Sequence, residues 1–221
     1  MIDRILEYIS IFLALLVVLP FHEFAHGFAA VKSGDFTPKL NNRYTLNPLA
    51  HFDISGLICF VIAGFGWAKP MPVNPNNFRN YKKGCFFVSI AGVLMNYILA
   101  FIAWPLLLLS IMYVPEFGYY TQVLQSTLSY IFSLSLSFFI FNLIPVYPLD
   151  GFRVVEVFNK KRGKVYQFLR YKGIYVLYFL IILSIVAEAT NIWTLNILGL
   201  IMNFFVGIIS QPITLFWSVL F

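Results

Sequence analysis

The chain has 221 residues, of which 60% are hydrophobic and 11% are charged, and its formal net charge at pH 7 is +6. Soluble globular domains are about 45–50% apolar and about 25% charged, so this composition excludes an ordinary soluble domain and indicates a membrane protein. The positive charge lies in loops between apolar stretches, which argues against a nucleic-acid-binding protein. We expect one membrane-embedded domain over residues 1–221, with a core at residues 5–153 and accessory helices in residues 171–221.

Five apolar stretches are long enough to cross a bilayer as helices, which takes about 17–25 residues. They run from Ile9 to Val31, from Cys85 to Met112, from Val123 to Leu149, from Tyr171 to Ala187 and from Trp193 to Phe221. The sequence therefore predicts an all-α polytopic membrane protein with about five transmembrane helices.

The first of these spans contains the sequence HEFAH at residues 22–26. Residues four apart share one face of a helix, so the imidazoles of His22 and His26 can bind one metal ion, with Glu23 beside them as a general base. Alternatively, the two histidines hydrogen-bond to neighbouring helices. The metal site is favoured, because ionisable groups inside a span are costly and by default mark a functional site.

Between the first two spans lies a shorter apolar run, Ile54 to Trp67, which is rich in glycine. It is too short to cross the bilayer as a helix. It predicts a re-entrant segment or a short β-hairpin that is buried in protein at membrane depth, where irregular backbone is tolerated. The polar residues 74–83 that follow are typical of a solvated loop.

A third metal ligand has to come from outside the HEFAH motif, because catalytic zinc sites usually have three protein ligands and one open position. Two candidates stand out: Asp150 after the third span and His51 between the first two. Pro145 and Pro148 interrupt regular helix just before Asp150 and let the backbone turn its carboxylate inward. A proline-broken helix end whose aspartate faces water fits the same residues equally well.

The basic residues divide the loops into two kinds. All Lys and Arg residues except Arg4 lie between the first and second spans, between the third and fourth, or, for Lys172, at the very start of the fourth, and residues 113–122 and 188–192 contain none. By the positive-inside rule, the basic loops are cytoplasmic and the N-terminus is outside. Basic loops also suit contact with anionic lipid headgroups. His26 precedes Lys32 by about 9 Å of helix, so the predicted site lies near the cytoplasmic face.

Five motifs follow one another along the first three spans. They are HEFAH, NPLAHFD, FGWAKPMPVNPNNFRN, the GxxxN of residues 92–96 and FNLIPVYPLDG. Together they resemble the site-2 protease family of intramembrane zinc metalloproteases, in a short form without a PDZ or CBS domain. The resemblance covers residues 15–153 and none of the last two spans.

The resemblance implies a role for each residue of the metal site. His22, His26 and Asp150 would be the ligands of one Zn²⁺ ion per chain, which decides between Asp150 and His51 in favour of the aspartate. Glu23 would be the catalytic base. His51 has no role in this scheme and remains of uncertain function.

The resemblance also implies which residues surround the metal. The residues that would line the active site or shape its substrate-binding edge are Asn96, Asn142, Pro145, Pro148 and Leu149. The segment from residue 46 to residue 73 would form a small membrane-associated β-structure that can pair with an unwound substrate. For the histidine at 51 and the two asparagines, hydrogen bonds that join packed helices are a plausible alternative.

Two positions depart from the pattern of the family. Val93 stands where the family often has a proline, and Phe152 stands where it often has a second glycine. Neither position is a proposed ligand, so we expect the change to affect local backbone shape and not activity.

The predicted function is that of an intramembrane zinc metalloprotease, which hydrolyses peptide bonds within or near transmembrane segments of substrate proteins. Its expected partners are those substrates and the lipid bilayer of a prokaryotic cell membrane, with room for a regulatory membrane partner or a second copy of the chain, and no nucleic acid.

The main alternative is a metal transporter or metal-dependent scaffold that uses the same ligands. A transporter needs polar groups on both sides of its site, whereas the polar groups here cluster towards the cytoplasmic half of the spans. An inactive relative has little support, because the base and all proposed ligands are present.

Overall fold

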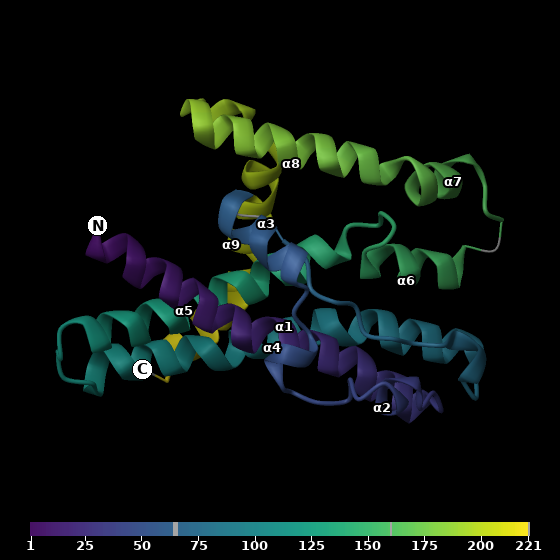
Figure 1. Ribbon diagram of the computed structural model, residues 1–221, viewed down its shortest axis with the longest axis horizontal. Helices are drawn as coiled ribbons and strands as arrows, with labels where there is room; N and C mark the ends of the chain where they lie inside the picture. Colours follow the sequence, from purple (N-terminus) through teal and green to yellow (C-terminus); the bar gives the residue numbers. More distant parts are fainter. Residues whose placement is uncertain (64–65, 160, 221) are drawn as a thin grey trace.

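The computed structural model describes residues 1–63, 66–159 and 161–220 (Figure 1). Among these residues, five helices are long and apolar enough to cross a membrane. They are α1 (Ile2–Ser33), α4 (Tyr81–Tyr113), α5 (Tyr119–Leu143), α8 (Gly173–Thr190) and α9 (Ile197–Ser218). The predicted all-α architecture and number of spans are confirmed, and the chain is a multi-pass membrane protein.

Shorter elements connect the long helices. They are α2 (Thr37–Leu40), η1 (Pro48–Ala50), α3 (Ile54–Ala63), η2 (Pro75–Asn77), α6 (Asp150–Phe158), α7 (Lys164–Tyr171) and η3 (Trp193–Leu195).

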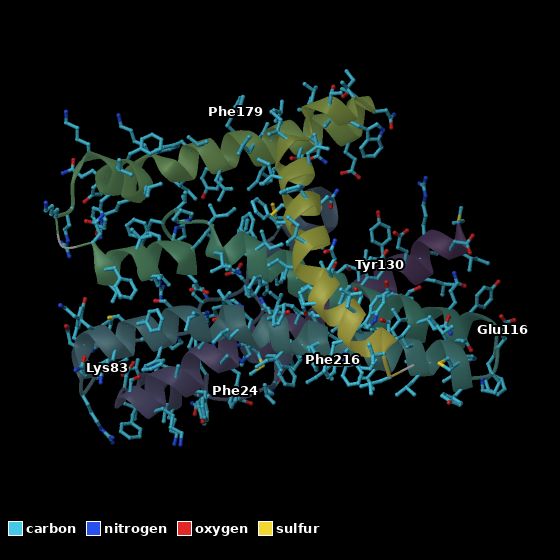
Figure 2. All side chains as sticks on the ribbon, turned by 180° about the vertical axis from the view of Figure 1, so that it is seen from behind. Phe24, Lys83, Glu116, Tyr130, Phe179 and Phe216 are labelled. Atoms are coloured by element: carbon cyan, nitrogen blue, oxygen red, sulfur yellow. The ribbon has the colours of Figure 1, made fainter. Side chains whose placement is uncertain are left out.

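Helices α1, α4 and α5 pack side by side and form the bundle that holds the site (Figure 1). Small or branched side chains at their contacts, such as Ala14, Val18 and Ala100, are completely buried. Small residues let helix backbones approach closely, which is how helices associate in lipid. The labelled Lys83 and Glu116 lie at opposite ends of this bundle (Figure 2).

The last two helices add to the bundle from one side. Helix α9 crosses it, where the rings of Phe216 and Phe101 lie 5.2 Å apart and the indole N–H of Trp217 donates to the carbonyl of Phe101 at 3.0 Å. Helix α8 stands away from α1 and α4, and its Phe179 points away from the bundle (Figure 2). Phe179 is 63% exposed, as expected of a side chain that faces lipid.

The segment between α1 and α4 differs from the predicted β-structure. No strand is found among the described residues, and an isolated antiparallel bridge joins Phe52 to Ala68. The chain between them includes the short helix α3 and returns to the bridge, so the β-element is not confirmed. Residues 64 and 65 of the predicted apolar run lie outside the described residues. Gly56 is required here, since a Cβ at this position would lie 2.0 Å from the carbonyl oxygen of Trp67.

The third span ends earlier than predicted. Helix α5 ends at Leu143 and not at Leu149, and residues 144–149 form an irregular turn that contains a cis peptide bond before Pro148. Pro145 has no N–H to continue the helix and disfavours helical backbone at the residue before it, which explains the early end. Asp150 then begins α6.

Candidate metal centre

Helix α1 places the two histidines of the HEFAH motif on one face. Both side chains are buried, and the Nε2 atoms of His22 and His26 lie 3.0 Å apart. They occupy the last third of a helix that continues to Ser33. The predicted pairing of the imidazoles is therefore present in the structure.

The first residue of α6 completes the group. Oδ2 of Asp150 lies 3.1 Å from Nε2 of His26 and 3.5 Å from Nε2 of His22. This oxygen is buried and has no hydrogen-bond partner of ordinary geometry among the described residues. Burial raises the pKa of the Asp150 carboxyl, but the two imidazoles lower it further, so the net pKa lies well below its usual range. Among the described residues, these three form a group that could hold a metal ion.

The spacing of the three donor atoms fits zinc. In a tetrahedral site with Zn–N and Zn–O distances of about 2.0–2.2 Å, neighbouring donors lie roughly 3.3 Å apart. The observed separations between the two Nε2 atoms and Oδ2 of Asp150 are 3.0, 3.1 and 3.5 Å, which lie on either side of that value. Two imidazoles and one carboxylate also leave the fourth position open, as catalytic zinc sites do.

Hydrogen bonds behind the imidazoles leave their Nε2 atoms free for a metal. Nδ1 of His26 lies 2.7 Å from the carbonyl oxygen of Val88 on α4 and must donate its proton there, so Nε2 keeps its lone pair. Nδ1 of His22 lies 3.0 Å from the amide of Asn96, whose Oδ1 has no hydrogen-bond partner. A 180° flip of the side-chain amide exchanges the positions of its oxygen and nitrogen. The orientation in which Oδ1 accepts the His22 proton satisfies both groups and suits metal binding.

A glycine on α4 makes room for the imidazoles. A Cβ at Gly92 would lie 2.4 Å from Nε2 of His26 and 2.7 Å from Nε2 of His22, so α4 can approach the site only with glycine at this position. The GxxxN motif thus has a physical basis that sequence reasoning missed: its glycine admits the two rings and its asparagine orients one of them.

Glu23 is held by the backbone of the segment before α4. Its Oε2 accepts a 2.6 Å hydrogen bond from the N–H of Met71, and its side chain is buried. The Met71 side chain packs against α1 at Gly27, where a Cβ would lie 3.1 Å from its terminal methyl carbon. Sequence reasoning also missed these two residues, although both belong to quoted motifs or directly follow one.

His51 is completely buried but does not join the metal group. Its Nε2 lies 2.7 Å from the carbonyl oxygen of Thr45, within its own loop. The alternative in which His51 replaces Asp150 as the third ligand is therefore not supported.

The predicted substrate-binding edge lies beside Asp150. Pro145 and Pro148 are exposed and Leu149 is half-buried, in the turn that leads directly to the aspartate. The amide of Asn142 donates to the carbonyl of Phe138 one turn earlier in α5, at 3.1 Å. This bond lies within α5, so it is not the bond between packed helices that the alternative expected for Asn142, and the roles of the edge residues stay predictions.

Comparison with known proteins finds one family model and one curated relative that match parts of the chain. Residues 108–186 match the model of Peptidase family M50, a stretch that includes Asp150 and extends into α8. The expectation that the last two spans carry none of the resemblance was therefore wrong for α8. The chain is also 43% identical over 145 residues to "Putative zinc metalloprotease YwhC" of Bacillus subtilis (strain 168).

That alignment covers 65% of this chain and 66% of the relative, so the chain spans just under two thirds of the relative's length. No solved structure matches the chain. Both matches point to peptidase family M50, the site-2 type of metalloprotease. The family predicted from the sequence motifs is thereby confirmed.

Proposed function

We propose that this protein is an intramembrane zinc metalloprotease that hydrolyses peptide bonds within or near the transmembrane segments of other proteins. The observation that carries the proposal is the convergence of the donor atoms of His22, His26 and Asp150, with Glu23 beside them. Three of these four residues lie on a helix that is long and apolar enough to cross a membrane.

The residues of the site divide into three ligands and one base. His22, His26 and Asp150 would hold a zinc ion, and the hydrogen bonds at Nδ1 of the two histidines fix their rings. Zinc in such a site acts as a Lewis acid, which makes a water molecule more acidic and polarises the scissile carbonyl. Glu23 takes the proton of the attacking water and passes it to the leaving amine. Oε2 of Glu23 accepts the hydrogen bond of the Met71 N–H, which fixes the position of the carboxylate.

A helical substrate has to unwind before it can be cut, because its carbonyls are engaged in its own hydrogen bonds. In the irregular turn at residues 144–149, Pro145, Tyr147 and Pro148 are exposed, and the turn ends at Asp150. An extended substrate segment that lies along this turn would present its carbonyl next to the metal. With the basic loops in the cytoplasm and the N-terminus outside, the cut falls near the cytoplasmic surface.

The test is cleavage by the detergent-purified protein. It is incubated with candidate single-span substrates, with and without a zinc chelator, and the products are mapped by mass spectrometry. We expect cuts within or next to the transmembrane segment, their loss with the chelator and their return with added zinc. Glu23→Gln should bind the same amount of zinc and reduce cleavage by about 10²–10⁴-fold, the usual contribution of a general base.

Two results would contradict the proposal. Undiminished cleavage by Glu23→Gln would remove that residue from its role as the base. Zinc flux into proteoliposomes that contain the protein, without any proteolysis, would favour the transporter alternative.

A further inference from the structure

A short proline-containing segment crosses α1 at the level of Glu23. We call residues 69–74 the proline strap. Pro70 and Pro72 have no N–H, so between them Met71 is the residue that can donate a backbone hydrogen bond, and it donates to Glu23 at 2.6 Å. The position of the carboxylate therefore depends on where the strap lies.

The strap is fastened at both ends. At its start, the N–H of Lys69 donates to the carbonyl of His51 at 2.8 Å, and Nη2 of Arg43 donates to the carbonyl of Lys69 at 2.6 Å. At its end, the N–H of Asn74 donates to the carboxylate of Asp35 at 2.7 Å. His51 thus contributes to the strap through its backbone, which gives this residue a structural place.

Arg43 is the unusual member of this arrangement. It is 7% exposed, and its Nε has no hydrogen-bond partner among the described residues. Burial lowers the pKa of its guanidinium, while the negative charge of Glu23 raises it. Burying an arginine with an unsatisfied N–H costs free energy. The Lys69 carbonyl does not need this arginine to be satisfied, because on an exposed surface it could accept a hydrogen bond from water instead. The cost indicates that the position of Lys69 matters.

We propose that Arg43 is a positioning residue for peptide-bond hydrolysis: it binds the Lys69 carbonyl and so fixes the strap whose Met71 N–H holds Glu23. The inference rests on the proposed function, because it assigns Glu23 a reaction in which its placement counts. Arg43 touches neither a proposed ligand nor the reacting atoms in this scheme, so it should affect the rate of the chemical step and not the amount of metal bound.

The experiment compares Arg43→Ala, Arg43→Lys and the matched control Arg79→Ala with the wild type. Arg79 is exposed, lies in the same inter-helix region, and has no side-chain hydrogen bond recorded among the described residues. Each protein is purified in detergent and measured for zinc content, for kcat and KM on one single-span substrate, and for amide hydrogen exchange of peptides that cover the strap.

For Arg43→Ala we expect faster exchange at Met71, unchanged zinc content and KM, and a kcat about 100-fold lower, the size of effect that a small misplacement of a catalytic group produces. Arg43→Lys keeps one donor and should recover kcat to about a tenth of the wild type or better. Arg79→Ala should behave as the wild type in all four measurements.

Unchanged strap exchange in Arg43→Ala would overturn the inference, and so would a loss of zinc that parallels the loss of cleavage. A raised KM with unchanged kcat would overturn it as well, because it would make Arg43 a substrate-binding residue. If the strap loosens in Arg43→Ala but the wild type cleaves no substrate, the proposed function fails while the coupling of Arg43 to the strap stands.

Discussion

The two halves of the site are built in different ways. The metal-binding half uses side chains on regular helices: His22 and His26 on α1, Asp150 at the start of α6, and supporting groups on α4. The half that holds Glu23 uses the backbone of an irregular segment, the proline strap. Helices set ligand positions through residue spacing, whereas the strap sets the position of the base through anchors far apart in sequence.

This difference separates metal binding from catalysis. A change in the helical half should alter zinc content and cleavage together. A change in the strap should alter cleavage while zinc stays bound. The following substitutions test that separation.

The largest effect is expected from Asp150→Ala. It removes one of three proposed ligands, so bound zinc should be lost and cleavage should fall by about 10⁴-fold, as for other active-site groups that act as a unit. His51→Ala is the comparison, because His51 is also buried but lies outside the metal group. Metal analysis of both purified variants measures the difference. A greater loss of zinc in His51→Ala than in Asp150→Ala would make His51 the third ligand.

Gly92→Ala should have the next largest effect. Its new Cβ would lie 2.4 Å from Nε2 of His26, so α4 or the ring has to move, and zinc affinity should fall by about 100-fold. Gly207→Ala in α9 is the matched control, since a Cβ there meets nothing within 4 Å. Competition with a zinc chelator reports both affinities. Equal affinities in the two variants would show that the contact at Gly92 does not constrain the site.

Asn96→Ala should weaken the site less. It removes the amide that orients His22 at 3.0 Å, and loss of such an outer partner should lower zinc affinity by about 10-fold, with a matching loss of cleavage at limiting zinc. Excess zinc should restore most of the cleavage. If excess zinc restores nothing, Asn96 acts on the substrate and not on the metal.

The smallest effect is expected in the strap anchor Asp35. Burial raises the pKa of its carboxyl, but hydrogen bonds from Thr37, Asn77 and the Asn74 N–H lower it further, so the pKa lies below its usual value. The ionised form therefore stabilises the folded protein at neutral pH, and this contribution is lost as the pH falls below about 4.

Asp35→Asn should lower the melting temperature at pH 7 by about 2–4 °C and speed amide exchange in the strap, with zinc content unchanged. Its melting temperature should also change less than that of the wild type when the pH is lowered from 5 to 3. Parallel pH dependences in the two proteins would show that Asp35 does not titrate in this range.

Much of the metal-binding half was predictable from the sequence. Apolar runs predicted the membrane spans, and the four-residue spacing of His22 and His26 predicted that both side chains share one helix face. From spacing alone Asp150 was no stronger a candidate than a solvent-facing aspartate, because two distant segments meet only in the folded chain. The motif resemblance resolved that choice, and the structure brings the carboxylate to the imidazoles.

The strap and its anchors were not predictable in the same way. Local pattern gave no reason to connect Arg43 or Asp35 to residues 69–74, since backbone hydrogen-bond partners leave no trace in residue type. The β-structure predicted for residues 46–73 is also not confirmed: among the described residues, α3 (Ile54–Ala63) forms there, with one isolated bridge between Phe52 and Ala68. A short apolar run fits a helix as well as a strand when no clear period distinguishes them.

The most direct measurement is X-ray absorption at the zinc edge of the purified, zinc-loaded protein. One zinc per chain, with two imidazoles and only nitrogen or oxygen donors at about 2.0–2.2 Å, is the result that the site built from α1 and α6 predicts. A sulfur donor at about 2.3 Å, contributed by Cys59 or Cys85, or a spectrum without imidazole, would contradict it.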